Sequence, residues 1–575
     1  MKELSKYIRP YVGFMLLTVL IKLSAAVLEL MLPYLMEQML DVHVPAGNAG
    51  AIYLCGGGML LCAMGCLGSN ILANRMSASS SGKITRAIRH DLFEKLQSLS
   101  AHQLDGLTVS SAESRLTSDT YNVNQMLARL QRMGIRAPSL LIGGVAMMLM
   151  MDPGLSLVLI ALLPIIGVVV YIVTKKSVPL YTRQQTTLDK VVRVVQENIT
   201  GIRVIKALSK TEYEKDRFHG VNDELSDIGL KAGMVSGATN PIASGVLRLG
   251  LTLVVLVGAF RVYDGRMDRG VILAFLQYFT MILNAMLAVT RIFVMMSKGE
   301  ASAKRVAEVL AMPRELTVAP GEADEDMGGD APHIEFRNVS FSYTGVGKNL
   351  DHLSFRLEKG QTLGILGPTG SGKSTVLNLL LRLYDVDEGQ VLIDGQDIRT
   401  VPHETLRKKF GVVFQNDFVA EGTIGDNIRF FRDVDADALE AAASMAQAEF
   451  IRHKEGGMEA EVAVRGNNLS GGQKQRLLIA RALAAKPEIL ILDDASSALD
   501  YATDAALRKA LRENCTDTTT VLVAQRISSL RHADLIIMLQ DGGVLGMGTH
   551  EEMMESCPEY RFLAHIQMGE GKEGA

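Results

Sequence analysis

Six apolar stretches dominate the first half of the chain, and each is long enough to cross a lipid bilayer. The apolar core of a bilayer requires about 20 residues of helix. Short connections join the stretches in pairs, which predicts a membrane domain of six helices. The stretches lie at residues 11–34, 50–73, 134–151, 154–174, 243–263 and 271–296.

Two long polar stretches, 74–133 and 175–241, separate the three pairs. Both are rich in lysine and arginine, whereas the short connections at 41–50 and 151–153 contain neither residue. Because loops rich in lysine and arginine stay in the cytoplasm, the long stretches are predicted to be cytoplasmic. The arginines near the third connection, 263–270, weaken this inference without reversing it.

The pattern changes after the sixth apolar stretch. Residues 311–332 are dominated by proline, glycine and acidic residues, which predicts a linker. From 333 to 568, short β-rich runs alternate with helical segments, as in a soluble α/β domain. Residues 569–575 are typical of a disordered tail. We therefore predict a multidomain chain, with an all-α polytopic membrane domain at 1–310 followed by an α/β domain.

Composition agrees with this division and excludes some functions. Hydrophobic residues make up 48% of the 575 residues, because one half of the chain is strongly apolar. The net charge of −4 does not indicate a nucleic-acid-binding protein. The five cysteines include no CxxC pair, so neither a zinc ribbon nor a redox motif is predicted.

The strongest chemical signal is GPTGSGKST at 367–375, which fits the P-loop pattern GxxxxGK[ST]. It follows a strand-like run at 362–366 and opens an apolar helix, which is the context that supports such a match. Backbone N–H groups of such a loop surround phosphates, with Lys373 reaching the β- and γ-phosphates and Ser374 binding Mg²⁺. The predicted ATP-binding residues are Gly367, Pro368, Thr369, Gly370, Ser371, Gly372, Lys373, Ser374 and Thr375.

A second motif, which is acidic, follows about 120 residues after the P-loop. There the apolar run 489–492 ends in Asp493 and Asp494. A buried strand that delivers a carboxylate at its end is the usual second half of a P-loop site, and Asp493 is predicted to hold Mg²⁺.

Between these motifs lies a third, Leu469-Ser470-Gly471-Gly472-Gln473, followed by a helical run. Ser470 is a natural N-cap, and the glycines expose backbone at the helix start, so this is a second phosphate-binding surface. One nucleotide cannot easily use both surfaces of a single domain. The physical solution is two such domains head to tail, each signature helix closing over the P-loop of the other.

These motifs closely resemble the ATP-binding cassette (ABC) family, in its exporter branch, over nearly the whole chain. The resemblance implies that Tyr343 stacks on adenine, that Gln415 senses the γ-phosphate beside Mg²⁺, and that Ser497 and Asp500 belong to the D-loop. It also implies ATP-driven export as half of a dimer in the cell membrane, with the α/β domain in the cytoplasm. A bacterial inner membrane is the expected location.

The long polar stretches resemble the intracellular loops of these exporters. The resemblance implies that each loop carries a short coupling helix that docks on an ATPase domain. We expect these helices near 102–112 and 210–222.

Two positions depart from the family pattern. Asp494 stands where exporters usually have the glutamate that polarises the attacking water, and Gln525 stands where they have a histidine. Aspartate withdraws its carboxylate by about 1.5 Å, and a misplacement of about 1 Å can cost on the order of 10²-fold in rate. Glutamine cannot carry a proton. Together the two departures predict a site that holds ATP and turns it over slowly.

In the head-to-tail arrangement, the intact signature motif of this chain contacts the nucleotide on the partner's P-loop. The weakened site holds a different nucleotide, the one on this chain's own P-loop. The sequence therefore favours the impaired-site subunit of a heterodimeric multidrug-type exporter, whose non-identical partner has the usual glutamate and histidine. A homodimeric exporter and a mainly regulatory ATP-binding subunit are the alternatives.

Polar residues in the membrane stretches are candidates for cargo contacts. Gln277, Asn284 and Arg291 follow each other at seven-residue spacing and share one helix face. They either contact a small amphipathic cargo, such as a drug, lipid or peptide-like molecule, or hydrogen-bond between helices. Lys22 and Glu29 in the first helix share a face by the same spacing and are expected to pair.

Overall fold

The computed structural model divides into two compact units. The first unit comprises residues 1–97 with 109–312, and the second comprises 98–108 with 313–575. Segment 98–108, predicted as part of the membrane domain, therefore groups with the C-terminal part of the chain. The structure describes residues 2–313, 316–319, 331–415, 418–495 and 497–568. Most of the predicted linker and the whole predicted tail lie outside these residues.

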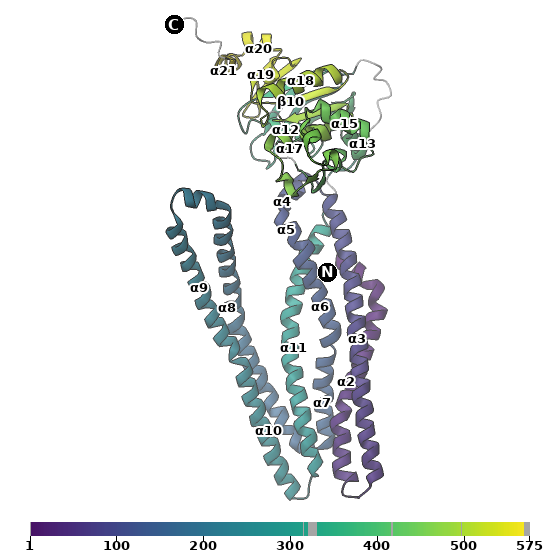
Figure 1. Ribbon diagram of the computed structural model, residues 1–575. Helices are drawn as coiled ribbons and strands as arrows, with labels where there is room; N and C mark the ends of the chain where they lie inside the picture. Colours follow the sequence, from purple (N-terminus) through teal and green to yellow (C-terminus); the bar gives the residue numbers. More distant parts are fainter. Residues whose placement is uncertain (1, 314–315, 320–330, 416–417, 496, 569–575) are drawn as a thin grey trace. The chain divides into compact units, whose positions relative to one another are not determined.

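The first unit is built from long helices (Figure 1). Helices α3, α8 and α11 contain 49, 55 and 42 residues, so they run without a break from the apolar stretches into the polar ones. The helices of this unit are α1 (Lys2–Ile8), η1 (Arg9–Tyr11), α2 (Val12–Gln38), η2 (Met39–His43), α3 (Ala49–Gln97), α5 (Val109–Ser114), η3 (Arg115–Asp119), α6 (Thr120–Met133), α7 (Arg136–Met151), α8 (Pro153–Ala207), α9 (Thr211–Gly237), α10 (Thr239–Tyr263) and α11 (Arg269–Leu310).

Five helical stretches among the described residues are long and apolar enough to cross a membrane. They lie within the ranges Leu4–His43, Ala49–Gln97, Val109–Met151, Ser244–Tyr263 and Arg269–Met286. Each overlaps one predicted span. The remaining predicted span, 154–174, lies in α8 and includes residues whose side chains are not described, so the count of six stays a prediction.

The apolar core of the first unit lies around α11. Phe275, Tyr278, Phe279 and Ile282 are fully buried there. The hydroxyl of Tyr278 donates to the carbonyl oxygen of Leu30 in α2 at 2.6 Å, which satisfies a polar atom that would otherwise be costly inside the bilayer. This face of α11 therefore holds α2 and α7 together.

The polar residues of α2 find partners other than those expected. Lys22 donates to Asn70 of α3 at 2.6 Å, and Glu29 forms a bidentate ion pair with Arg136 of α7 at 2.7 Å. The predicted Lys22–Glu29 pair is therefore wrong. A charge in a membrane helix gains more from a partner across a helix interface, because helix packing buries both groups.

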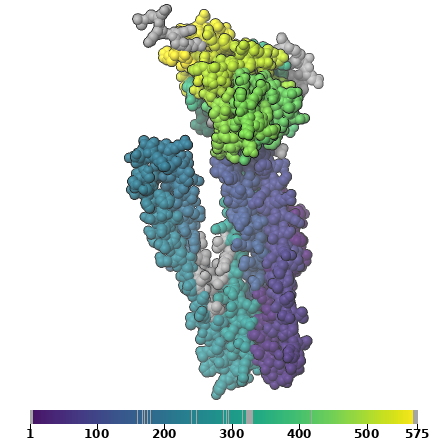
Figure 2. All heavy atoms as spheres, in the orientation of Figure 1, coloured from purple at the N-terminus to yellow at the C-terminus, as the bar shows by residue number. Residues whose placement is uncertain are grey.

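Helices α8 and α9 form an antiparallel hairpin whose far end diverges from the rest of the unit (Figure 1). Residues 208–210 make the turn, and α9 then runs unbroken from Thr211, so no separate short helix exists at 210–222. Glu197 of α8 pairs with Arg217 of α9 at 2.5 Å across the turn. Figure 2 shows an open gap beside this hairpin, and apolar side chains on it are exposed, including Ile199 and Leu208.

The second unit contains two main sheets. The six-stranded sheet has the order β12-β11-β3-β10-β9-β6, with β11, β3, β10, β9 and β6 parallel, and the four-stranded sheet has the order β2-β1-β4-β5. The strands are β1 (Ile334–Phe341), β2 (Leu350–Leu357), β3 (Thr362–Leu366), β4 (Glu388–Ile393), β5 (Gln396–Asp397), β6 (Phe410–Val413), β7 (Gly422–Thr423), β8 (Glu461–Val462), β9 (Ile489–Asp493), β10 (Thr519–Val523), β11 (Leu535–Gln540) and β12 (Gly543–Gly548).

Helices cover these sheets over separate apolar cores. One core packs α12 between the two sheets, and a second packs α14, α15 and α17 against β9. The helices are α4 (Ala101–Leu107), α12 (Lys373–Leu380), α13 (His403–Lys408), α14 (Ile424–Arg429), α15 (Ala436–Met445), α16 (Phe450–His453), η4 (Gly457–Glu459), η5 (Val464–Gly466), α17 (Gly471–Leu483), α18 (Tyr501–Asn514), α19 (Ile527–Leu530), α20 (His550–Ser556) and α21 (Pro558–Met568).

Asp152 fixes the connection between α7 and α8. Its carboxylate accepts a hydrogen bond from the backbone N–H of Leu155 at 2.7 Å, which caps α8, and forms an ion pair with Arg261 at 2.9 Å. Its side chain is only 6% exposed, so both partners are needed to offset the burial of the charge.

Asp152→Ala is expected to lower the midpoint of thermal unfolding, because it removes an N-cap worth about 1 kcal/mol and leaves Arg261 without its partner. Asp152→Asn keeps an oxygen for the cap and is expected to have a smaller effect. Circular dichroism of the purified protein in detergent measures this midpoint. The control is Asp264→Ala, which changes an exposed aspartate in the turn between α10 and α11. Equal midpoints for Asp152→Ala and wild type would contradict the assignment.

Candidate nucleotide site

The P-loop joins the buried strand β3 to α12, as predicted. Gly370 and Gly372 adopt φ values of 87° and 102°, which L-residues rarely accept, and Gly372 is the N-cap of α12. A Cβ on Gly372 would lie 2.6 Å from the carbonyl oxygen of Asn349, so only glycine fits there. The loop thus presents backbone N–H groups at the start of a helix, the usual geometry for binding phosphate.

Lys373 extends from the first turn of α12 over the loop. Its ammonium group donates to the carbonyl oxygens of Gly367 at 2.9 Å and Pro368 at 2.7 Å. Burial lowers the pKa of Lys373, and the carboxylates of Asp493 and Asp494 oppose that shift. The ammonium group of Lys373 therefore lies close to the carboxylates of Asp493 and Asp494.

The two acids follow each other at the carboxyl end of β9. The Asp493 carboxylate lies 3.5 Å from the hydroxyl of Ser374, and burial raises the pKa of both Asp493 and Asp494. Asp494 has a φ of 49°, and its N–H donates to the carbonyl oxygen of Val523 in β10 at 2.9 Å. With this backbone conformation, Asp494 does not continue the pattern of β9, in which successive side chains point to opposite faces of the sheet.

The two residues that depart from the family pattern meet in space. The amide nitrogen of Gln525, an exposed residue between β10 and α19, donates to the Asp494 carboxylate at 3.4 Å. Ser497, in the predicted D-loop, donates from its hydroxyl to the carbonyl oxygen of Asp494 at 2.9 Å. The structure therefore joins Asp494, Gln525 and Ser497 in one hydrogen-bonded group.

Gln567 in α21 is a contact residue that sequence reasoning missed. Its amide nitrogen donates to the carbonyl oxygen of Gln525 at 3.0 Å, and its amide oxygen accepts from the N–H of Ile527 at 2.8 Å. Gln567 thereby holds the backbone on both sides of Arg526. No local motif marks it, because the contact spans about 40 residues of sequence.

Tyr343 lies in a cluster of aromatic rings with Phe341 and Tyr384. Its ring meets those two rings edge-on at centroid distances of 4.9 and 5.0 Å, and its hydroxyl accepts from Asn378 at 2.9 Å. Its predicted adenine contact stays a prediction, as does the role of Gln415, which is exposed in the turn after β6.

Tyr384 connects this aromatic cluster to α4, which overlaps the segment 102–112 where a coupling helix is expected. Its hydroxyl donates to the carboxylate of Asp105 at 2.5 Å. Burial and the nearby Asp105 charge raise the pKa of Tyr384 well above its usual range, so the hydroxyl remains a donor at neutral pH. Gln103 of α4 also donates to the carbonyl oxygen of Pro313 at 2.9 Å. Helix α4 is therefore docked through its own polar side chains.

The signature motif begins α17. The hydroxyl of Ser470 accepts from the N–H of Gln473 at 3.3 Å, and the Gln473 side chain accepts from the N–H of Ser470 at 2.9 Å, which forms a capping box. A Cβ on Gly472 would lie 3.2 Å from the carbonyl oxygen of Ala498, so the motif packs against the predicted D-loop. Asp500 in that loop caps α18 through the N–H of Thr503 at 2.9 Å.

Comparisons with known proteins agree with this fold and site. The family model for the ABC transporter transmembrane region matches residues 15–286, and that for the ABC transporter matches residues 350–497. The chain is 32% identical to an uncharacterized ABC transporter ATP-binding protein, YfiB, of Bacillus subtilis, over 100% of both chains. It is 31% identical to a fatty acid ABC transporter ATP-binding/permease protein of Mycobacterium bovis, over 81% of this chain and 74% of that one.

A solved structure has the same fold. The structure of a bacterial Atm1-family ABC exporter with ATP bound aligns with a TM-score of 0.78, at 24% identity and over 99% of each chain.

The fold and site define a multi-pass membrane protein with a fused P-loop ATPase domain in the cytoplasm. The chain belongs to the ABC transporter family, and it joins one transmembrane region to one ATP-binding domain, which is the make-up of a half-transporter. Such a half-transporter binds and hydrolyses ATP and works as a dimer in the lipid bilayer.

Tyr384→Phe is expected to leave ATP affinity unchanged and to reduce transport per ATP hydrolysed by about tenfold, because it removes a hydrogen bond to a carboxylate worth more than 1 kcal/mol. Binding of a fluorescent ATP analogue, ATPase activity and uptake into inverted vesicles measure the three quantities. Tyr263→Phe, at a tyrosine that is 89% exposed in the first unit, is the matched control. Unchanged transport per ATP would show that the Tyr384–Asp105 contact does not couple the two activities.

Proposed function

We propose that this chain is the impaired-site subunit of a heterodimeric exporter. Its P-loop site binds ATP and turns it over slowly, while its LSGGQ motif completes the active site of a non-identical partner. The observation that carries the proposal is the hydrogen bond between Asp494 and Gln525, at the two positions that depart from the family pattern.

The chemistry of this pair supports slow turnover. A glutamate at 494 would reach about 1.5 Å further towards an attacking water, whereas the Asp494 carboxylate is held within 3.4 Å of the Gln525 amide. The amide offers a hydrogen bond but accepts no proton, so it cannot replace a histidine in proton transfer. Lys373 and the loop glycines keep their usual chemistry, so ATP binding is retained.

The same site fits Mg²⁺. The hydroxyl of Ser374 and the carboxylate of Asp493 are oxygen donors 3.5 Å apart, which is the ligand chemistry that Mg²⁺ prefers. Ser374, Asp493 and Gln415 would hold the ion, which would supply positive charge to the phosphates.

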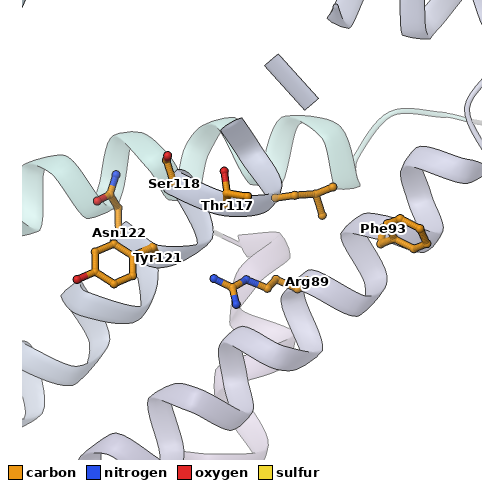
Figure 3. A pocket seen from close by; sticks show the side chains of 7 residues that line it. Arg89, Phe93, Thr117, Ser118, Tyr121 and Asn122 are labelled. Atoms are coloured by element: carbon orange, nitrogen blue, oxygen red, sulfur yellow. The ribbon is translucent and has the colours of Figure 1, made fainter. Parts of the chain in front are cut away.

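Two features of the first unit support assembly with a second half-transporter. The α8–α9 hairpin exposes apolar side chains in its diverging part, including Ile199 at 70% and Leu208 at 64%. A hollow of about 740 Å³ lies on the unit between α3 and the η3–α6 segment (Figure 3). Two aromatic residues that line it, Phe93 and Tyr121, are 56% and 57% exposed, as is common where a partner helix packs.

The proposed cargo is a small amphipathic molecule. Gln277 and Asn284 are exposed on α11, opposite the face that buries Tyr278 and Ile282, and so provide a polar stripe on an apolar helix. The side chain of Arg291 lies outside the described residues. The name of the Mycobacterium bovis relative refers to fatty acids, which are molecules of this class.

Two other functions remain as second candidates. In a homodimeric exporter both sites would contain Asp494, and each would hydrolyse ATP at an ordinary rate. In a mainly regulatory subunit the site would only sense ATP, so Asp494→Asn would leave the ATPase activity of the complex unchanged.

The double variant Asp494→Glu with Gln525→His is expected to raise the ATPase activity of this subunit, purified alone, by about 10²-fold, because it restores the reach of the carboxylate and a group that accepts a proton. Phosphate release measures the rate. Asp437→Glu, an exposed change of the same chemistry, is the control. A wild-type rate typical of exporters, unchanged in the double variant, would remove the basis for an impaired site.

Two variants in the complex with its native partner separate the roles of the two surfaces. Ser470→Arg is expected to lower the ATPase activity of the complex by about 10²-fold, because it blocks the phosphate-binding end of α17 in the partner's active site. Lys373→Ala is expected to lower the activity less than about tenfold. Equal losses from both changes would indicate two equivalent sites and would contradict the proposed asymmetry.

A further inference from the structure

A second cavity, of about 520 Å³, lies in the second unit away from the P-loop. Its walls are α18, strands β9 and β10, and the segment that contains α19. Apolar side chains line much of it, among them Leu507 and Leu511 of α18 and Leu522 of β10. The volume falls within the range of cavities that hold small organic molecules, roughly 300–1,000 Å³.

Buried polar groups also line this cavity. The hydroxyl of Ser529 is buried and has no hydrogen-bond partner among the described residues. Asp504 is 2% exposed, and its carboxylate pairs with Arg508 at 2.9 Å. Arg508 also donates to the carbonyl oxygen of Ser528 at 2.6 Å. A buried hydroxyl without a partner is costly, so its presence in a cavity wall points to a ligand that bonds to it.

Two arginines and two aspartates line the cavity, and they differ in their partners. The carboxylate of Asp504 is engaged by Arg508, and that of Asp534 accepts from the N–H of Thr362 at 2.7 Å. Arg512 lies exposed at the rim, and none of the described carboxylates forms an ion pair with it. The cavity therefore combines an apolar interior with an arginine that forms no ion pair with a described carboxylate, and with a buried hydroxyl that has no hydrogen-bond partner among the described residues.

We propose that this cavity is a binding site for an amphipathic organic carboxylate. The apolar chain of the ligand packs on Leu507, Leu511 and Leu522, and Arg512 and Ser529 supply the donors for its polar group. The assignment is independent of the impaired-site proposal, because it uses none of the residues at the P-loop.

The position of the cavity connects such a ligand with the nucleotide site. Helix α18 starts directly after Asp500 of the D-loop, and α19 starts two residues after Gln525. A ligand between the two helices would contact the elements that carry both loops.

Protection of Cys515 tests the assignment in the purified full-length chain. Cys515 lines the cavity and is partly exposed, and Cys55 in α3 provides an internal reference. The probes are octanoate, octylamine and octanol, which share a tail and differ in head group. Alkylation by iodoacetamide is quantified for each cysteine by peptide mass spectrometry. Octanoate at ten times its dissociation constant is expected to slow alkylation of Cys515 by about tenfold, whereas octylamine and Cys55 show no protection.

Charge reversal makes the test specific. Arg512→Glu is expected to abolish protection by octanoate, and Ser529→Ala to weaken it several-fold. Lys509→Glu is the matched control, because it makes the same charge change on the same helix but does not line the cavity. The rise in thermal unfolding midpoint with octanoate, compared between wild type and Arg512→Glu, checks binding without relying on the thiol. Equal protection by all three probes, or identical responses of the two proteins, would overturn the assignment.

Discussion

The parallel pairing of three buried strands is the constraint on which the nucleotide site depends. Val523 of β10 lies opposite Ile365 of β3 on one side and Asp493 of β9 on the other. The carboxyl ends of the three strands therefore lie at one edge of the sheet, so the P-loop, the two aspartates and Gln525 meet there. Because most residues of the three strands are apolar and buried, a shift in this register would expose a core face, and the chemistry at the edge is held in place by the core.

The same edge explains why two unusual residues act together. Asp494 adopts a left-handed backbone conformation and is bonded through its N–H to β10, while Gln525 lies two residues after the end of β10. A change at one position alters the environment of the other, since the two side chains share a hydrogen bond. Gln567 adds a third constraint from the C-terminal helix. The proposed slow turnover therefore depends on Asp494, Gln525 and Gln567 together, and not only on the methylene by which aspartate is shorter than glutamate.

The first unit illustrates a different constraint, which is that polar atoms inside a bilayer need partners within the protein. Tyr278 satisfies its hydroxyl on a backbone carbonyl, Glu29 pairs with Arg136, and Lys22 bonds to Asn70. Each bond joins different helices, so the polar residues specify how the bundle packs. In the second unit, α4 is also held by a hydrogen bond between polar side chains, here outside the membrane. Asp105 of α4 accepts from Tyr384, which belongs to the aromatic cluster of Tyr343.

The sequence alone determined what depends on local pattern. Apolar stretches of membrane length, the P-loop between strand and helix and the capped helix after residue 470 were legible, because spacing and residue type suffice for them. The departures at 494 and 525 could be seen only by comparison with the pattern of the ABC family, which the motifs resemble. Only the tertiary structure decided which distant groups meet: Gln525 with Asp494, Gln567 with Ile527, Glu29 with Arg136 instead of Lys22, and residues 210–222 as the start of a long helix. These outcomes depend on how helices and strands pack, and the energy of a contact between residues far apart in sequence leaves no periodic signal along the chain.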